Sequence, residues 1–279
     1  MALAETESGV RYDPAALDRV ERRFWREIFD SVPGEVAAER GIELRAFGQV
    51  QAQVVKDLPE AKMLNLVLGA AEDVERGGEG LGAATAWAAE QGVASYIPVT
   101  PALPGAPAAE TWLQGNGFER SYSWMKFVRD PHPPRFPAPE VEVVELTAPD
   151  QEPFGMIAAT GFGMYAWAAD FFAHLPGREG WRCYVAKVDG EAQACGAMLI
   201  DDGIAELGIG ATLEAARGRG CQTALLHRRI ADAGETGCHT LFVETGERVP
   251  DRPAASYRNI LRAGFEEAYL RPNWQPAAV

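Results

Sequence analysis

The sequence predicts a mixed α/β fold built from two similar halves, and three observations carry this prediction. Segments with the length and alternation of strands are followed by segments with helical spacing. A proline-rich stretch near the middle separates two segments that carry the same motifs in the same order. In the second segment, a turn rich in glycine and arginine joins a strand to a helix, where a ligand could approach the backbone.

The length and the proline-rich stretch set the expected domain boundaries. The chain has 279 residues, which suits two domains of about 140 residues each. Asp130–Glu140 contains five prolines, which cannot continue a helix or donate to a sheet ladder, so we expect a stiff, extended linker. The predicted organisation is a domain over residues 1–130, a linker over 131–140 and a second domain over 141–279.

The two segments that flank this linker resemble each other. Glu90-Gln-Gly92 in the first matches Glu235-Thr-Gly237 in the second, and Gly117-Phe118 matches Gly264-Phe265. The matches occur in the same order and follow the same alternation of helix and strand. The sequence therefore predicts a duplicated domain.

Periodicity and turn residues predict the helices and strands. Tyr12–Phe29 in the first half is expected to be an amphipathic helix, with Leu17, Val20, Phe24 and Ile28 on one stripe. In the second half, Gln151–His174 is expected to be helical or loop-like. The predicted strands are Val141–Leu146, Trp181–Val188, Ala192–Ile200, Ile204–Thr212, Leu241–Glu244 and Glu266–Leu270. The predicted helices are Gly220–Ala233 and Ala254–Ala263, the latter ended by Gly264.

Charge and hydropathy exclude some classes of function. The formal net charge is −14, which argues against a nucleic-acid-binding protein. An acidic surface suits a cationic substrate such as an amine, and equally suits a protein that is merely soluble. No apolar run has the length of a membrane span, and the acidic N-terminus does not resemble a signal peptide. We therefore expect a cytoplasmic protein without a membrane partner.

The cysteines and histidines do not form a metal-binding pattern. Cys183, Cys195, Cys221 and Cys238 form no CxxC pair and have no histidine at ligand spacing, so we expect no metal. They are interpreted as reduced thiols. His227 and His239 are expected to be surface or structurally satisfied residues, and a nucleophilic role for Cys221 lacks a supporting His–Asp pair.

The most informative motif is Arg217-Gly218-Arg219-Gly220-Cys221-Gln222, directly after the strand Ile204–Thr212 and at the start of a helix. Glycines allow close approach to the backbone, and the first amides of a helix lack internal partners. Together with arginines they can bind a pyrophosphate. The alternative is an ordinary strand–turn–helix connection with solvated arginines. Neither GxGxxG nor a Walker loop is present.

From Val141 onward the chain resembles the GCN5-related N-acetyltransferases (GNAT). That family carries Arg/Gln-x-x-Gly-x-Gly/Ala at the corresponding helix start, and residues 217–222 match it except that Gln222 replaces the small residue. Asn259–Phe265 resembles the family's last helix, which reads roughly Leu-Tyr-Glu-Lys-Leu-Gly-Phe. The resemblance implies tandem GNAT-like domains that use acetyl-CoA or another acyl-CoA and no metal. Its pyrophosphate would lie on residues 217–222, and its pantetheine arm along Gly210, Ala211 and Thr212.

The resemblance also suggests catalytic residues. Glu206 lies where several family members keep a general base, and burial on its apolar strand would raise its pKa. The alternative is a solvent-facing carboxylate on an edge strand. The family's usual acid, a tyrosine, is replaced here by Ile260. Tyr257 and Ser256 are the nearest candidates, although packing is the competing role for Tyr257.

Two further regions have expected roles. The aromatic stretch Gly161–Phe172 with Asp170 resembles the acceptor-binding region by position, and could hold an ammonium ion or simply fill the core. In the first half, Ala71–Glu79 occupies the place of the phosphate-binding turn, and its acidic side chains would repel pyrophosphate. We expect that half to bind no coenzyme A. It would instead cover the cleft, contact substrate or mediate self-association, including a homodimer.

The resemblance implies acyl transfer from acyl-CoA to an amine, on a small molecule or a peptide, by direct transfer. A second interpretation is a non-catalytic acyl-CoA-binding or regulatory module, because the usual tyrosine is missing. A third is a nucleotide-binding protein that uses the same glycine turn. The acceptor itself cannot be deduced, since acceptor pockets are built from variable loops.

Overall fold

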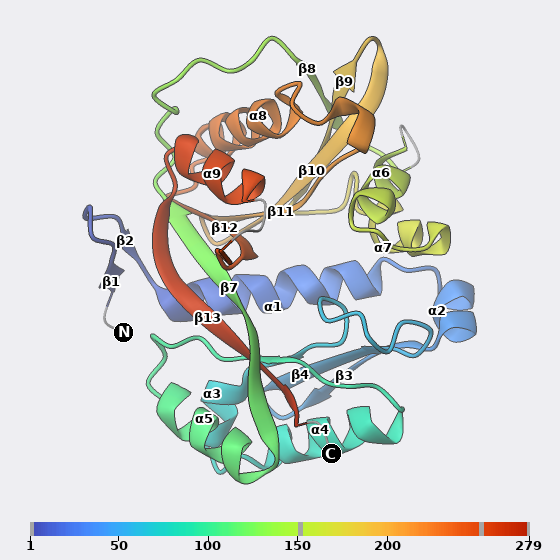
Figure 1. Ribbon diagram of the computed structural model, residues 1–279, viewed down its shortest axis with the longest axis vertical. Helices are drawn as coiled ribbons and strands as arrows, with labels where there is room; N and C mark the ends of the chain where they lie inside the picture. Colours follow the sequence, from blue (N-terminus) through green and yellow to red (C-terminus); the bar gives the residue numbers. More distant parts are fainter. Residues whose placement is uncertain (1–2, 150–152, 251–253, 278–279) are drawn as a thin grey trace.

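The central sheet draws strands from both halves of the chain. The structure, a computed structural model, describes residues 3–149, 153–250 and 254–277. Within them, eight strands form one sheet in the order β6-β13-β7-β12-β11-β10-β9-β8 (Figure 1). These strands are β6 (Ile97–Pro98), β7 (Phe118–Arg129), β8 (Glu142–Leu146), β9 (Trp181–Val188), β10 (Glu191–Asp201), β11 (Ile204–Thr212), β12 (Thr240–Gly246) and β13 (Glu266–Pro276).

The last strand of each half pairs with strands of the other half. β7 belongs to the first half, yet it lies between β12 and β13, with Arg129 opposite Leu241. β13 in turn pairs with β6, with Trp274 opposite Ile97. Figure 1 shows β7 and β13 running side by side from the upper to the lower part of the molecule. The segment 131–140 contains no helix or strand. It divides the chain there, but the sheet is continuous across the two halves.

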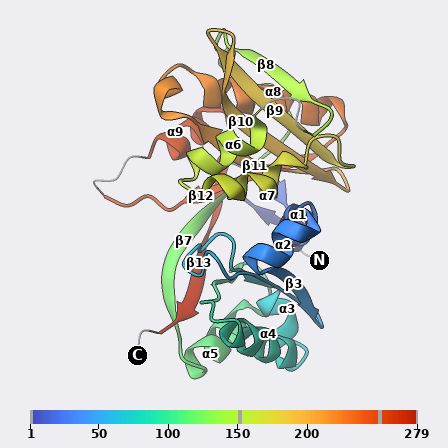
Figure 2. The ribbon, with the colours of Figure 1, turned by 90° about the vertical axis from the view of Figure 1, so that its right-hand side faces the viewer.

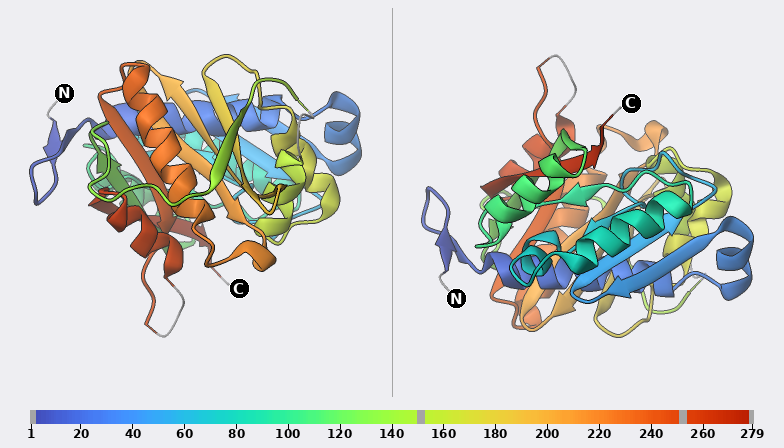
Figure 3. Two further views of the ribbon diagram at one scale, coloured as in Figure 1. Left: turned by 90° about the horizontal axis from the view of Figure 1, so that it is seen from above. Right: turned by 90° about the horizontal axis from the view of Figure 1, so that it is seen from below.

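Corresponding elements follow the same order in both halves, which confirms the predicted duplication. The first half contains the hairpin β3 (Ile42–Phe47) and β4 (Val50–Val55), then β5 (Val67–Leu68), α3 (Ala70–Val74), α4 (Glu79–Glu90), β6, α5 (Ala106–Gly115) and β7. The second contains the hairpin β9–β10, then β11, η2 (Glu214–Ala216), α8 (Cys221–Glu235), β12, α9 (Ala255–Arg262) and β13. Seen from above and below, α8 covers the upper strands and α4 covers β3 and β4 (Figure 3).

Helix α1 (Pro14–Asp30) lies between the two halves (Figures 1 and 2). It begins where Asp13 accepts a hydrogen bond from the Ala15 amide at 3.1 Å and Pro14 occupies the first helical position. The predicted stripe Leu17, Val20, Phe24 and Ile28 is buried. Phe24 packs directly on Gly208 of β11, where an added Cβ would come within 2.3 Å of the ring. A helix of the first half therefore forms one wall of the space beneath β11.

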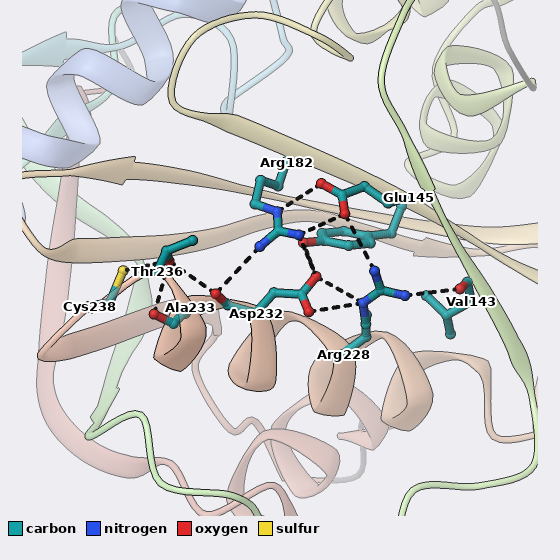
Figure 4. A network of polar contacts seen from close by, with 9 residues as sticks. Val143, Glu145, Arg182, Arg228, Asp232, Ala233, Thr236 and Cys238 are labelled. Atoms are coloured by element: carbon teal, nitrogen blue, oxygen red, sulfur yellow. Dashed lines mark hydrogen bonds and ion pairs between the residues drawn. The ribbon is translucent and has the colours of Figure 1, made fainter.

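A charged network fixes α8 against the outer strands (Figure 4). Asp232 of α8 is 5% exposed and pairs with Arg182 of β9 at 3.0 Å and with Arg228 of α8 at 2.8 Å. Glu145 of β8 contacts both arginines, at 2.7 and 3.4 Å. Because these partners surround the buried carboxylate of Asp232 and neutralise it, they hold α8 against the outer strands, and the N-terminus of α8 lies beside β11.

The observed elements agree with the predicted ranges to within a few residues, except at β13. The sequence predicts that this strand ends at Leu270, whereas it continues to Pro276. Proline is rare inside sheets because it cannot donate to the ladder. Here the register between β13 and β7 shifts between Pro272 and Trp274, so a bulge accommodates the proline.

The predicted segment Gln151–His174 begins outside the described residues. From residue 153 onward it contains α6 (Phe154–Gly161), the short 3-10 helix η1 (Ala166–Ala169) and α7 (Asp170–Ala173). These pack beside α1 and the upper sheet in the largest hydrophobic cluster. The segment is therefore helical with a turn in its middle.

Candidate active site

The two parallel strands β11 and β12 separate halfway along their length. They pair only over Ile204–Leu207 and Thr240–Val243. Directly after this, β11 contains one extra residue between Gly208 and Ala211 relative to β10, and Ile209 has a φ of 50°. A β-branched residue rarely adopts this conformation, so the bulge is a strained feature. The separation opens the space in which the candidate site lies.

A cleft of about 610 Å3 lies between the end of β11, the start of α8 and α9. Eight of the nine residues predicted to contact coenzyme A line it: Gly210, Ala211, Thr212, Arg217, Gly218, Gly220, Cys221 and Gln222. Gly218 and Gly220 have φ values of 79° and 85°. A Cβ added at Gly218 would meet nothing within 4 Å. The turn is thus open toward the cleft and presents the free amides of the helix start to a ligand.

The ninth predicted residue, Arg219, points elsewhere. Its guanidinium pairs with Asp189, in the turn between β9 and β10, at 2.7 Å. This hydrogen bond lowers the pKa of the Asp189 carboxyl. Arg262 of α9 lines the cleft together with Arg217. Arg262 could not be predicted from the sequence, because the position of α9 relative to the turn depends on tertiary packing.

Gln222, the departure from the family pattern, links two helices. Its Nε2 donates to the Ser256 hydroxyl at 2.9 Å, and its Oε1 accepts from Asn259 Nδ2 at 2.8 Å. The first turn of α8 is therefore joined to α9 by hydrogen bonds where a small residue would allow close packing. Ser256 lines both this cleft and a deeper cavity.

That central cavity has a volume of about 300 Å3 and shares several lining residues with the cleft. The shared residues are Phe162, Gly210, Gln222, Arg229 and Ser256. Much of its apolar wall comes from the first half: Phe24, Trp25 and Ile28 of α1, Met63, and Trp124 of β7. Two carboxyl groups, Glu206 and Glu244, also line it. The site is thus built by both halves of the chain.

Glu206 lies inside this cavity on β11. It is 4% exposed, and its Oε2 is buried without a hydrogen-bond partner in the described part of the chain. Burial raises the pKa of Glu206 well above its usual value, and the carboxylates of Glu21 and Glu244 add to this, while Lys126 and Arg271 oppose it. Glu206 is therefore buried, as its proposed role as a base requires.

Four charged groups beside Glu206 neutralise one another. Lys126 Nζ lies 2.9 Å from a Glu21 oxygen and 2.7 Å from a Glu244 oxygen. Arg271 pairs with the same two glutamates, at 2.5 and 3.0 Å. Burial would raise the pKa of Glu21, but Arg271 and Lys126 lower it to about 2. Two cations thus balance two carboxylates, and Glu206 is the remaining acid, which favours its neutral form in the free protein.

Tyr257 is not among the residues that line the central cavity or the cleft. Its ring packs edge-on against Phe127 with centroids 4.8 Å apart, and its hydroxyl donates to Glu267 at 2.5 Å. Burial and this hydrogen bond raise its pKa. Ile260, at the place of the family's tyrosine, lines the cavity and is 1% exposed. The structure therefore brings no phenol to the expected position within the described residues.

A third cavity of about 470 Å3 continues from the central one. Met63, Trp124 and Phe162 line both. The first part of the predicted acceptor region, Phe162–Tyr165, lines this outer cavity, whereas Phe171 is buried in the core. Asp170 lies on the surface side, 4.0 Å from His174, and does not line the cavity.

In the first half, the counterpart of the predicted phosphate-binding turn is filled by its own side chain. Asp73 accepts a hydrogen bond from the amide of Leu81, in the first turn of α4, at 2.8 Å. Asp73 is 6% exposed. Its carboxylate thus occupies the place at the helix N-terminus that an anion would take.

Other classes of site find no support in the described residues. They contain no group of three or more His, Cys, Asp or Glu side chains that could hold a metal ion. All four cysteines are buried and unpaired, and burial raises the pKa of Cys221. Among the helices described, none combines the length and apolar character required to cross a membrane.

Comparison with known proteins relates this architecture to one group of solved structures. No family model matches the sequence, and no curated protein matches it. A GCN5-related N-acetyltransferase from Kribbella flavida has a similar structure, with a TM-score of 0.61 and 17% identity, covering 94% of this chain and 96% of that one.

Two further structures extend the likeness. One is a tandem GNAT protein from the clavulanic acid biosynthesis pathway, with a TM-score of 0.54 and 17% identity over 81% of this chain and 77% of that one. The other is a GNAT-family acetyltransferase from Colwellia psychrerythraea, with a TM-score of 0.53 and 14% identity over 99% of both chains. Together they establish that the chain has the tandem form of this fold.

Proposed function

We propose that this chain, which has the fold of the tandem GCN5-related N-acetyltransferases, transfers an acyl group from an acyl-CoA, such as acetyl-CoA, to an amine. One observation carries the proposal. The cleft at the start of α8 opens into a cavity that contains a buried carboxyl group, Glu206, without a hydrogen-bond partner in the described residues. An anion-binding site and a poised acid–base group thus meet in one continuous space.

The residues of the cleft suit the acyl donor. The open turn at Gly218 and the free amides of α8 offer donors to a pyrophosphate, and Arg217 and Arg262 add positive charge. The separated end of β11, over Gly210–Thr212, offers backbone groups to an amide-bearing arm. The thioester end of that arm would then reach the central cavity.

The proposed base is Glu206. Acyl transfer requires a neutral amine held against the thioester carbon, and the nitrogen loses one further proton after attack. The carboxylate of Glu206 accepts that proton. Its raised pKa makes it a stronger base than an exposed glutamate. An approaching ammonium group favours the ionised form of Glu206, because opposite charges stabilise each other in the buried site.

We further propose that the acceptor carries its amine on an apolar body. The wall of the outer cavity is mostly apolar and aromatic, with Glu60 and Lys62 as its charged members; the others include Leu58, Met63, Tyr122, Trp124, Met164 and Tyr165. The outer cavity leads to the central cavity, where Glu206 and Glu244 form part of the wall. A small aromatic amine, or an amine on an apolar peptide end, would bury its body in the outer cavity and direct its nitrogen inward.

The first test is a thermal shift with acetyl-CoA, CoA, NAD and ATP. It uses the wild type, Gly218→Asp and the control Gly237→Asp. Both glycines have a φ of 79° and open space around them, but Gly237 lies beyond the far end of α8. The two variants therefore carry similar backbone strain, and only the first places a carboxylate in the cleft. Ligands that bind the native state raise its thermal midpoint.

We expect acetyl-CoA and CoA to stabilise the wild type and Gly237→Asp but not Gly218→Asp. Acetylation of members of a panel of aromatic amines would then support acyl transfer as the activity. Binding of CoA species without any turnover would favour a non-catalytic acyl-CoA-binding module, for which Ile260 at the acid position is the supporting observation. Stabilisation by NAD or ATP and not by CoA would contradict acyl transfer and support a nucleotide-binding protein.

A further inference from the structure

Arg229 of α8 is a buried cation without an acidic partner. It is 3% exposed, and no carboxylate pairs with it in the described residues. Its hydrogen bonds go only to backbone carbonyls, from Nε to Leu225 at 3.1 Å and from Nη1 to Ala197 and Gly208 at 2.9 and 3.1 Å. Its neighbour Arg228 pairs with two acids. A buried charge normally requires such compensation, so Arg229 is anomalous.

The guanidinium lies where the two cavities meet. Arg229 lines both the cleft and the central cavity, beside the bulge of β11. Nη2 donates no hydrogen bond within the described residues and so retains free donors. The guanidinium rests on Gly196 of β10, where an added Cβ would lie 3.0 Å from Cζ. The strand thus provides room for this group, which remains available to an anion.

The proposed reaction creates an anion at this junction. The usual phenol is replaced by Ile260, and the Tyr257 hydroxyl is bound to Glu267. We propose that Arg229 stabilises the departing thiolate of coenzyme A, a catalytic role that rests on the acyl transfer proposed above. A preorganised charge in a site shielded from water is well suited to this purpose.

The step is balanced without any further reactant. The neutral amine attacks the thioester carbon, a C–N bond forms, and the C–S bond breaks with both electrons passing to sulfur. The proton lost by the nitrogen goes to Glu206. The sulfur leaves as a thiolate paired with the guanidinium of Arg229, and it is protonated only after release.

The test measures the affinities of the wild type for CoA and acetyl-CoA by calorimetry from about pH 6 to about pH 9, a range that spans the usual thiol pKa of about 8.5. Only CoA has an ionisable thiol. If Arg229 favours the thiolate, the preference for CoA over acetyl-CoA rises with pH by about tenfold or more. A preference that stays constant with pH would overturn the proposal.

The groups in contact with the guanidinium do not titrate within the measured pH range. Burial raises the pKa of Cys195 to about 12, and burial together with a hydrogen bond to Asp232 raises the pKa of Tyr184. Burial lowers the pKa of Arg229 itself to about 10, so it remains charged over most of the range. Glu206 lines the same cavity, so Glu206→Gln measured beside the wild type separates its contribution from that of Arg229.

Variants assign the effect to this residue. Arg229→Gln should abolish the pH-dependent preference for CoA while acetyl-CoA still binds, and the matched control Arg228→Gln should retain it. Should Arg229→Gln fail to fold, Gly196→Ala displaces the guanidinium and should reduce the preference. Persistence of the preference in Arg229→Gln or in Gly196→Ala would refute the role. If neither CoA nor acetyl-CoA binds the wild type, the proposed function itself fails, and this inference fails with it.

Discussion

The protonation of Glu206 links stability to the proposed chemistry. Its pKa in the folded protein is raised above that in the unfolded chain, chiefly by burial. The neutral form is therefore the one that favours folding, and this contribution is lost as the pH rises through the raised pKa. The base needed for reaction is the ionised form, which is the form that the fold tolerates less well.

We predict that Glu206→Gln lowers kcat/KM by about 10²- to 10⁴-fold. In the wild type, kcat/KM should rise with pH as Glu206 ionises, and this rise should be absent from the variant. The thermal midpoint of the variant should fall less than that of the wild type as the pH increases, because no buried carboxyl ionises. Glu191→Gln, an exposed glutamate on β10, is the control. Unchanged kinetics in Glu206→Gln would exclude it as the base.

A second prediction concerns Tyr257. Because its hydroxyl is bound to Glu267, Tyr257→Phe should change kcat by less than about threefold and reduce the free energy of unfolding by about 0.5 to 1.5 kcal/mol. Steady-state kinetics and denaturant unfolding measure the two effects. A loss of kcat similar to that of Glu206→Gln would instead show that Tyr257 takes part in the reaction.

Residue types were easier to predict from the sequence than side-chain directions. The glycines of residues 217–222 are recognisable because their backbone role is local. Arg217 and Arg219 are equivalent in the sequence, and only the position of Asp189 separates their roles. Arg229 follows a helical pattern that gives no sign of its missing counter-ion.

At the level of elements, the turn before α4 shows why the first half is not expected to bind an anion where the second half is proposed to bind one. The N-terminus of α4 is bound internally by Asp73, whereas that of α8 faces a cleft. The acidic residues of Ala71–Glu79 were predicted to repel phosphate. The structure adds that one of them takes the place of the anion, a distinction that depends on the direction of a single side chain.

We predict that calorimetry gives one acyl-CoA bound per chain, not two. Asp73→Ala should leave this stoichiometry unchanged and lower the free energy of unfolding by about 1 to 2 kcal/mol, because the Leu81 amide loses its acceptor. Glu75→Ala, at an exposed position beside it, should have little effect. Two bound ligands per wild-type chain would contradict this account of the first half.

The length of β13 shows that strand propensities of single residues do not determine where a strand ends. Pro272 and Pro276 both argue against a strand, yet β13 includes them. The strand continues because it has partners on both sides, β7 and β6. The partner of a strand cannot be derived from its own residues, so the sequence predicted the element but not its length.

For the whole molecule, the exchange of β7 and β13 makes each half incomplete alone. We predict that residues 131–279, expressed separately, do not unfold cooperatively and do not bind acetyl-CoA, because β12 and β13 lose β7 between them. Mixing that fragment with residues 1–130 should restore binding. Thermal unfolding and calorimetry provide the measurements.

The control for this prediction is a full chain cut after folding. A protease site placed within residues 131–140, which contain no helix or strand, should allow cleavage without loss of binding. If the isolated second half binds acetyl-CoA as well as the cut chain does, β7 is dispensable for that half.

The duplication was predictable from two matched motifs, but the exchange was not. β7 and β13 follow similar motifs, so the sequence does not determine which strands of the central sheet each one joins. Their placement is decided by long-range packing, including α1, whose residues Phe24, Trp25 and Ile28 complete a cavity centred on the other half. Sequence periodicity reports which face of α1 is buried, without reporting what it is buried against.

The position of β7 also has a consequence for synthesis of the chain on the ribosome. Arg129 emerges long before its partner Leu241, so β7 has one or both edges unpaired while most of the second half is still being made. Pairings between such distant segments form slowly, and unpaired edges invite association with other nascent chains. β7 contains charged and polar residues, among them Glu119, Arg120 and Lys126. While its edges are unpaired, these residues make β7 less prone to aggregation than an apolar strand would be.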